Sequence, residues 1–137
     1  VETKGKHCVV VGASRLVGAP LSMMLAEQGR ATVTICHKYT ENLAAHTRKA
    51  DILLVAVGKP GLITGDMVKE GVVVIDIGTS RVDDPSKPKG FVLKGDVDFE
   101  SVAPKASLIT PVPGGVGPMT IVSLLMNTLK ASEKRTL

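Results

Sequence analysis

Continuous apolar runs, each closed by a glycine, are the feature that most constrains how this chain can fold. Residues 9–11, 52–57 and 72–77 are almost wholly β-branched or aliphatic, and a glycine follows each run directly. Such runs indicate strands buried on both faces, because a strand with one wet face alternates apolar and polar residues. Segments with helical spacing separate the runs. This alternation predicts an α/β domain, with a doubly wound, mostly parallel sheet and helices on both faces.

Turn residues and helix caps divide the chain further. Thr40 and Thr64 are placed to cap two short helices, and Gly29 to end the first long one. The loop 83–90 has the composition of an exposed connection within one domain. We expect strands at residues 6–11, 31–36, 52–57, 72–77, 91–93 and 107–109, and helices at residues 17–28, 41–49, 65–70, 98–103 and 118–132.

Composition restricts the classes of partner. Aromatic residues make up only 2% of the chain, which disfavours binding of single-stranded nucleic acid by base stacking. The net charge of +4 comes from 17 basic and 13 acidic residues spread along the chain, as on a mildly basic surface. No apolar run approaches the ~20 residues of a membrane span. We therefore expect neither nucleic acid nor a membrane as a partner. Cys8 and Cys36 lack metal-type spacing, which favours buried free thiols in a reducing compartment.

Residues 9–20 (VVVGASRLVGAP) combine a strand, a glycine turn and the start of a helix. This order of elements suits a phosphate, because free N–H groups and the helix dipole both point at the turn. The match to the dinucleotide pattern G-x-G-x-x-G is imperfect, since Ser14 replaces the second glycine and Gly18 comes one place late. By itself the segment fits an ordinary tight turn as well as a nucleotide-binding one. Arg15 is a candidate for a cofactor phosphate or a solvent-facing cation.

Other features gather at the same edge of the predicted sheet. Ligands bind at the carboxyl ends of parallel strands, and Gly12, Gly58 and Gly78 at those ends would let a ligand approach the backbone. Lys38 follows the second strand, where NAD-binding sheets usually have an acidic residue, and its charge suits the 2′-phosphate of NADP. The loop 110–120, rich in proline and glycine, feeds the last helix and is a second candidate binding element.

Several other chemistries lack the required spacing. The segment after Gly12 has no Walker lysine, and the three histidines have neither the spacing nor the neighbours of a zinc site. Ser14 lacks the G-x-S-x-G context of a nucleophile. For Asp96 and Asp98, a turn and a helix cap are favoured over a pair of carboxylates.

Five ordered segments resemble the NAD(P)-binding domain of bifunctional methylenetetrahydrofolate dehydrogenase/methenyltetrahydrofolate cyclohydrolases. The most specific is ITPVPGGVGPMT at 109–120, which matches the hallmark loop of that family. The segment 10–20 matches its variant nucleotide turn, including the serine. Segments 56–60, 74–78 and 95–97 agree as well. The resemblance covers residues 5–130 and implies a Rossmann-like fold.

The resemblance also implies a function. The family transfers hydride from 5,10-methylenetetrahydrofolate to NADP, with NAD as the alternative cofactor, and hydrolyses the methenyl product to 10-formyltetrahydrofolate. By similarity, the turn at residues 12–14 contacts the cofactor phosphates, Lys38 faces the 2′-phosphate, and Thr79 lies beside the nicotinamide. The cofactor-site residues we expect are Gly12, Ala13, Ser14, Arg15, Lys38, Gly58 and Thr79. The folate-facing residues are Pro113, Gly114, Gly115, Val116 and Gly117.

In this family the lysine and tyrosine that handle protons lie in a preceding domain. We expect residues 1–137 to form the NAD(P)-binding domain alone, to bind dinucleotide weakly, and to lack both activities in isolation. A tetrahydrofolate substrate, a homodimer, and a cytoplasmic or alternatively mitochondrial location are further expectations. The alternative hypothesis, from another functional class, is a non-catalytic module that binds a dinucleotide or serves in assembly.

Overall fold

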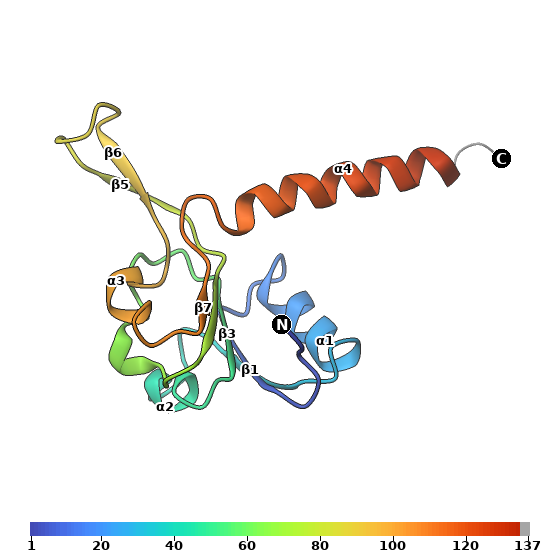
Figure 1. Ribbon diagram of the computed structural model, residues 1–137, viewed down its shortest axis with the longest axis horizontal. Coiled ribbons are helices and arrows are strands. Elements are labelled where there is room, and N and C mark those ends of the chain that lie inside the picture. Colours follow the sequence, from blue (N-terminus) through green and yellow to red (C-terminus); the bar gives the residue numbers. More distant parts are fainter. Residues whose placement is uncertain (135–137) are drawn as a thin grey trace.

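A five-stranded parallel sheet forms the centre of the computed structural model, which describes residues 1–134 (Figure 1). The strand order is β2-β1-β3-β4-β7, and every neighbouring pair is parallel. The predicted doubly wound, Rossmann-like sheet is confirmed. Its strands are β1 (His7–Val11), β2 (Thr32–Cys36), β3 (Ile52–Val55), β4 (Val73–Asp76) and β7 (Leu108–Ile109).

Helices cover both faces of the sheet because side chains alternate along each strand. One face of β1 and β3 packs against α1 (Gly18–Glu27) through the half-buried Leu21 and Leu25. The other face carries fully buried side chains such as Leu53 and meets the remaining short helices. These are α2 (Leu43–Thr47), the 3-10 helix η1 (Gly65–Met67) and α3 (Phe99–Val102).

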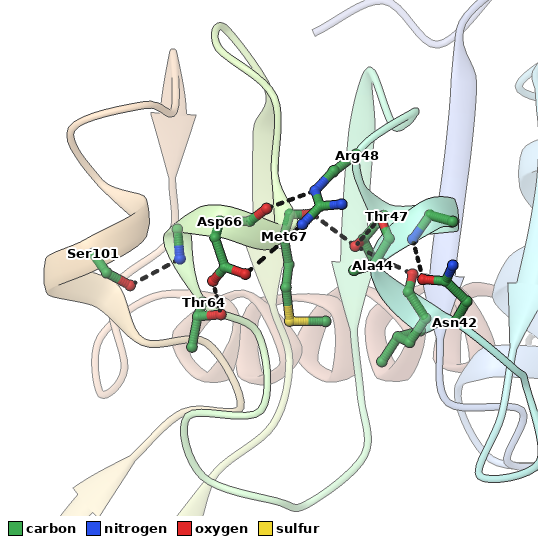
Figure 2. Close-up of polar contacts among 11 residues, drawn as sticks. Asn42, Ala44, Thr47, Arg48, Thr64, Asp66, Met67 and Ser101 are labelled. Atoms are coloured by element: carbon green, nitrogen blue, oxygen red, sulfur yellow. Dashed lines mark hydrogen bonds and ion pairs between the residues drawn. The ribbon is translucent and has the colours of Figure 1, made fainter.

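Polar contacts tie α2, η1 and α3 into one layer, as Figure 2 shows. The buried Thr47 hydroxyl donates to the Met67 carbonyl oxygen at 2.7 Å, and Arg48 Nε donates to the Asp66 carbonyl oxygen at 2.7 Å. The backbone N–H of Gly65 donates to the Ser101 hydroxyl at 3.0 Å. These hydrogen bonds join the three short helices to one another on the same face of the sheet.

Two elements project from this body (Figure 1). The antiparallel hairpin β5 (Ser80–Asp83) and β6 (Phe91–Lys94) is separate from the main sheet. Helix α4 (Val116–Lys134) extends away from the sheet, and all of residues 117–133 are exposed, including large apolar side chains such as Leu124 and Leu125. Within residues 1–134, no helix, including α4, is both long and apolar enough to cross a membrane.

Two predicted helix caps and one strand differ from the structure. Thr40 does not cap α2, since its hydroxyl accepts from the His37 N–H; Asn42 is the capping residue. Thr64 does not cap its helix either, because its hydroxyl donates to the Asp66 side chain. Strand β5 is absent from the sequence prediction, because its residues lack an apolar run and it depends on pairing with β6.

Candidate functional site

A cavity of about 500 Å³ opens at the carboxyl ends of β1 and β3. Strand β2 lies on one side of β1 in the sheet and β3 lies on the other side. The chain therefore reverses its direction of strand addition at β1, and the cavity lies at this point. Open α/β sheets bind their ligands at such a point. The cavity is lined by Val11, Gly12, Ala13, Ser14, His37, Lys38, Thr40, Leu43, Ala56, Val57, Lys59 and Leu62.

Gly12 lets the turn after β1 pass close to the end of β3. Its φ is +111°, which disfavours any side chain, and an added Cβ would overlap the Ala56 carbonyl oxygen. Gly18 is close-packed in the same way, because a Cβ there would overlap the Gly12 carbonyl oxygen. The two glycines therefore bring β1, β3 and the start of α1 together at the cavity.

The turn between β1 and α1 contains unpaired donors, and its residues Ala13 and Ser14 line this cavity. Among the described residues, the backbone N–H groups of residues 13–16 donate to no partner. The Ser14 hydroxyl accepts from the Val17 N–H at 3.1 Å, which leaves its own proton available to an acceptor. Successive free N–H groups in a turn form a site for an anion, and the dipole of α1, which begins at Gly18, favours negative charge nearby.

Basic side chains border the other side of the cavity. Lys38 follows β2 and lies with its Nζ 4.8 Å from the centroid of the Tyr39 ring. Lys59 follows β3, and both lysines are exposed. The cavity therefore combines a turn with free backbone donors on one wall and exposed cations on the others, which suits a ligand with several phosphates.

A second cavity, of about 490 Å³, opens at the carboxyl ends of β4 and β7. The loop 111–118 forms most of its wall, and the Val112–Pro113 peptide bond in this loop is cis. Asp76, Thr79 and Thr120 are the polar side chains in a lining that is otherwise largely apolar. This composition suits a flat organic ligand with few polar anchors.

The structure brings most of the predicted site residues to these two cavities. Gly12, Ala13, Ser14 and Lys38 line the first, and residues 113–117 all line the second. Gly58 lies between two lining residues of the first cavity, with a φ of +76° that its turn requires. Thr79 lines the second cavity with the loop. Arg15 is exposed and lines neither.

Sequence reasoning missed His37, Thr40, Val57 and Lys59 in the first cavity. Their positions directly after β2 and β3 could have identified them, because those strand ends meet at one edge. Gly78 was predicted to leave room for a ligand. The space beside it is filled instead by the Asp96 carboxylate, which an added Cβ would overlap.

Asp76 and Asp96 are the buried acidic residues of the described chain. Asp96 does not pair with Asp98; its backbone N–H donates to Asp76 Oδ1 at 3.1 Å. The Asp98 side chain makes no capping hydrogen bond to α3. Burial raises the pKa of the Asp76 carboxyl, hydrogen bonds from backbone N–H groups counter this rise, and the charge of Asp96 adds to it.

Residues 1–136 match the family model described as tetrahydrofolate dehydrogenase/cyclohydrolase, NAD(P)-binding domain. Similar curated proteins include bifunctional protein FolD of Cytophaga hutchinsonii, 60% identical over 135 residues, which are 96% of this chain and 47% of that protein. The same-named protein of Amoebophilus asiaticus is 58% identical over 138 residues, 98% of this chain and 46% of that protein. The chain thus spans about half the length of these relatives.

Solved structures agree with the sequence matches. The bifunctional FolD enzyme of Campylobacter jejuni superposes with a TM-score of 0.89 at 49% identity, covering 98% of this chain and 45% of that one. The Trypanosoma brucei methylenetetrahydrofolate dehydrogenase-cyclohydrolase, solved with NADP cofactor and an inhibitor, gives a TM-score of 0.92 at 45% identity. That match covers 98% of this chain and 46% of the other.

Proposed function

The chain belongs to the family of NAD(P)-binding domains of tetrahydrofolate dehydrogenase/cyclohydrolases, and from this premise we propose that it is the cofactor-binding part of such an enzyme. The proposed enzyme oxidises 5,10-methylenetetrahydrofolate with NADP and hydrolyses the methenyl product to 10-formyltetrahydrofolate. NADP, when bound, accepts the hydride. The residues of this chain bind and orient the cofactor and form one wall of the folate site.

The observation that carries the cofactor proposal is the set of unpaired N–H groups at residues 13–16, in the turn that precedes α1. Ala13 and Ser14 of this turn line the cavity at the point where the strand order reverses, which is where open α/β sheets bind a dinucleotide. Lys38, across the cavity, is proposed to contact the adenosine 2′-phosphate, which NAD lacks. Arg15 is exposed near this turn and is proposed to contribute charge without lining the cavity.

The second cavity supports the folate proposal. Its lining by residues 113–117 combines an apolar surface with few polar groups, as a pterin ring stacked beside a nicotinamide would need. Thr79 lies in this cavity and is proposed to contact the nicotinamide end of the cofactor. The cofactor would therefore run from the Gly12 turn toward the loop.

Calorimetric titration of the chain with NADP⁺ and NAD⁺ tests the cofactor proposal. We expect weak but saturable binding of NADP⁺, with a smaller Kd than that of NAD⁺. Absence of dinucleotide binding would contradict the proposed function, and equal or tighter NAD⁺ binding would contradict the role of Lys38.

A homodimer is part of the proposal. Helix α4 exposes Met119, Ile121, Val122, Leu124, Leu125, Met126 and Leu129, and exposed apolar surface on this scale marks an interaction site. Sedimentation equilibrium of the chain tests this, with a dimer mass expected and a monomer mass at all concentrations contradicting it.

The proposed compartment is the cytoplasm, with the mitochondrion as the alternative. Cys8 and Cys36 support a reducing compartment, since both are free and buried. Burial raises the pKa of each thiol, which keeps the thiolate fraction and the reactivity low. Thiol labelling of the folded chain should therefore be slow compared with labelling of the denatured chain.

A further inference from the structure

The roles proposed so far explain neither of the buried carboxylates, Asp76 and Asp96. Asp76 lines the second cavity, whereas Asp96 is fully buried and accepts a hydrogen bond from the N–H of Val57, which lines the first. No ion pair of residues 1–134 includes either carboxylate. A buried charge without a cation must be stabilised by hydrogen bonds, so the donors around it show what it holds in place.

Backbone N–H groups are the donors to both carboxylates. Asp96 Oδ2 accepts from the N–H groups of Val57 at 2.6 Å and Gly58 at 2.8 Å. Asp76 accepts from Gly78 at 3.1 Å, and also from Asp96 at 3.1 Å and Val97 at 2.9 Å. The chain after β6 is thereby fixed to the exit of β4, and its Asp96 side chain is fixed to the exit of β3.

The exit of β3 is a wall of the first cavity. Val57 lines that cavity, and the Ala56 carbonyl lies against the Gly12 turn. The Val57 and Gly58 N–H groups have no acceptor other than Asp96 among the described residues. The backbone N–H of Ala56 still donates to the Val11 carbonyl oxygen at 2.8 Å, so β1 holds the end of β3 up to that residue. Beyond it, the Val57–Gly58 turn is held by one carboxylate oxygen.

Two glycines make room for this arrangement. An added Cβ at Gly78 would overlap the Asp96 carboxylate, and one at Gly95 would overlap Asp76 Oδ2. The second oxygen of Asp96, Oδ1, is buried and has no partner among the described residues. Oδ2 is thus the oxygen that holds the turn, and exchange of Oδ1 for another atom of similar size breaks no hydrogen bond of the described residues.

We propose that Asp96 is a positioning residue for the dinucleotide site: its Oδ2 holds the Val57–Gly58 turn at the distance from the Gly12 turn that the cofactor needs. Asp76 orients Asp96 through the backbone of residues 96 and 97. This inference rests on the proposed cofactor function of the first cavity. It assigns to Asp96 no contact with the cofactor itself.

Calorimetric titration of the wild-type chain and three variants with NADP⁺ tests the proposal. Asp96→Ala removes the acceptor and should weaken NADP⁺ binding by about tenfold or more, the loss expected for two backbone hydrogen bonds that order the site. Asp96→Asn keeps a side-chain oxygen that can accept from the N–H groups of Val57 and Gly58, and its amide nitrogen takes the place of Oδ1. Its Kd should stay within about threefold of wild type.

Asp51→Ala is the matched control, because Asp51 also accepts a backbone N–H, that of His7 at 2.8 Å, but at the opposite end of β3. It should lose stability without losing cofactor affinity. Wild-type affinity in Asp96→Ala, or equal weakening in Asp96→Asn and Asp96→Ala, would overturn the inference. Failure of the wild-type chain and of Asp51→Ala to bind would instead contradict the proposed function.

Hydrogen exchange of the cofactor-free wild-type chain tests the same point without a variant. The amides of Val57 and Gly58 should exchange more slowly than those of residues 13–16, which have no acceptor. Equal exchange rates in the two segments would overturn the inference even if Asp96→Ala does not fold.

Discussion

Replacing Gly12 with alanine should both destabilise the domain and impair its cofactor site. The φ of +111° is unfavourable for alanine, at a cost of about 1–2 kcal/mol. The new methyl group would also overlap the Ala56 carbonyl oxygen, and relieving an overlap with backbone in a packed region costs about 1–3 kcal/mol. The expected loss in free energy of unfolding is therefore roughly 2–5 kcal/mol, out of the 5–15 kcal/mol typical of a domain.

Gly71→Ala separates the two contributions. Gly71 has a φ of +75°, but no atom lies within 4 Å of an added Cβ, so only the backbone cost of about 1–2 kcal/mol applies. Urea denaturation of both variants gives the difference in stability, and NADP⁺ titration gives the effect on the site. Gly12→Ala should bind NADP⁺ much more weakly than Gly71→Ala. Equal stabilities and wild-type affinity in both variants would refute the close approach of β1 and β3 as the basis of the site.

Three further predictions concern charge and association. Lys38→Ala should weaken NADP⁺ binding about tenfold and leave NAD⁺ binding nearly unchanged, since a charge-assisted phosphate contact is lost; an equal effect on both cofactors in calorimetry would contradict this. The Lys69 ammonium, at 2.5 Å, holds the pKa of Asp51 below its usual range. This ion pair should contribute about 0.5–1 kcal/mol to the free energy of unfolding, because both side chains are partly exposed. The contribution should be present above pH 4 and be lost as the pH falls through the lowered pKa of Asp51. Asp51→Asn should flatten this part of the pH–stability curve, and an unchanged curve would refute the prediction. Leu125→Lys on α4 should reduce self-association in sedimentation, whereas Asn127→Lys on the same exposed helix should not.

The sheet could be predicted from the sequence because its signal is local. Runs such as 52–57 can be satisfied only by burial on both faces, and the glycine after each run marks a strand end. The structure confirms β1, β3 and β4 at the three glycine-closed runs and adds β2 and β7 to the same parallel sheet. Strand β5 could not be predicted, because Ser80–Asp83 is polar and forms a strand only through its pairing with β6.

The candidate site was predictable where a residue lies directly at a strand end, as Gly12 and Lys38 do. The role of a residue was not predictable where that role depends on a contact with a residue far away in the sequence. Gly78 has the same sequence context as Gly58, yet its open side is filled by Asp96, 18 residues later. Pairing of Asp96 with Asp76 likewise depends on how the chain returns from the hairpin to the sheet.

Amide chemical-shift mapping of the ¹⁵N-labelled chain during titration with NADP⁺ tests the central claim most directly, because it locates the ligand as well as detecting it. The amides of Gly12, Ser14, Lys38 and Gly58, at the carboxyl ends of β1, β2 and β3, should shift in a saturable way. Those near Asp51, at the amino end of the sheet, should not. No saturable shifts, or shifts centred away from the Gly12 turn, would contradict a dinucleotide site at this edge.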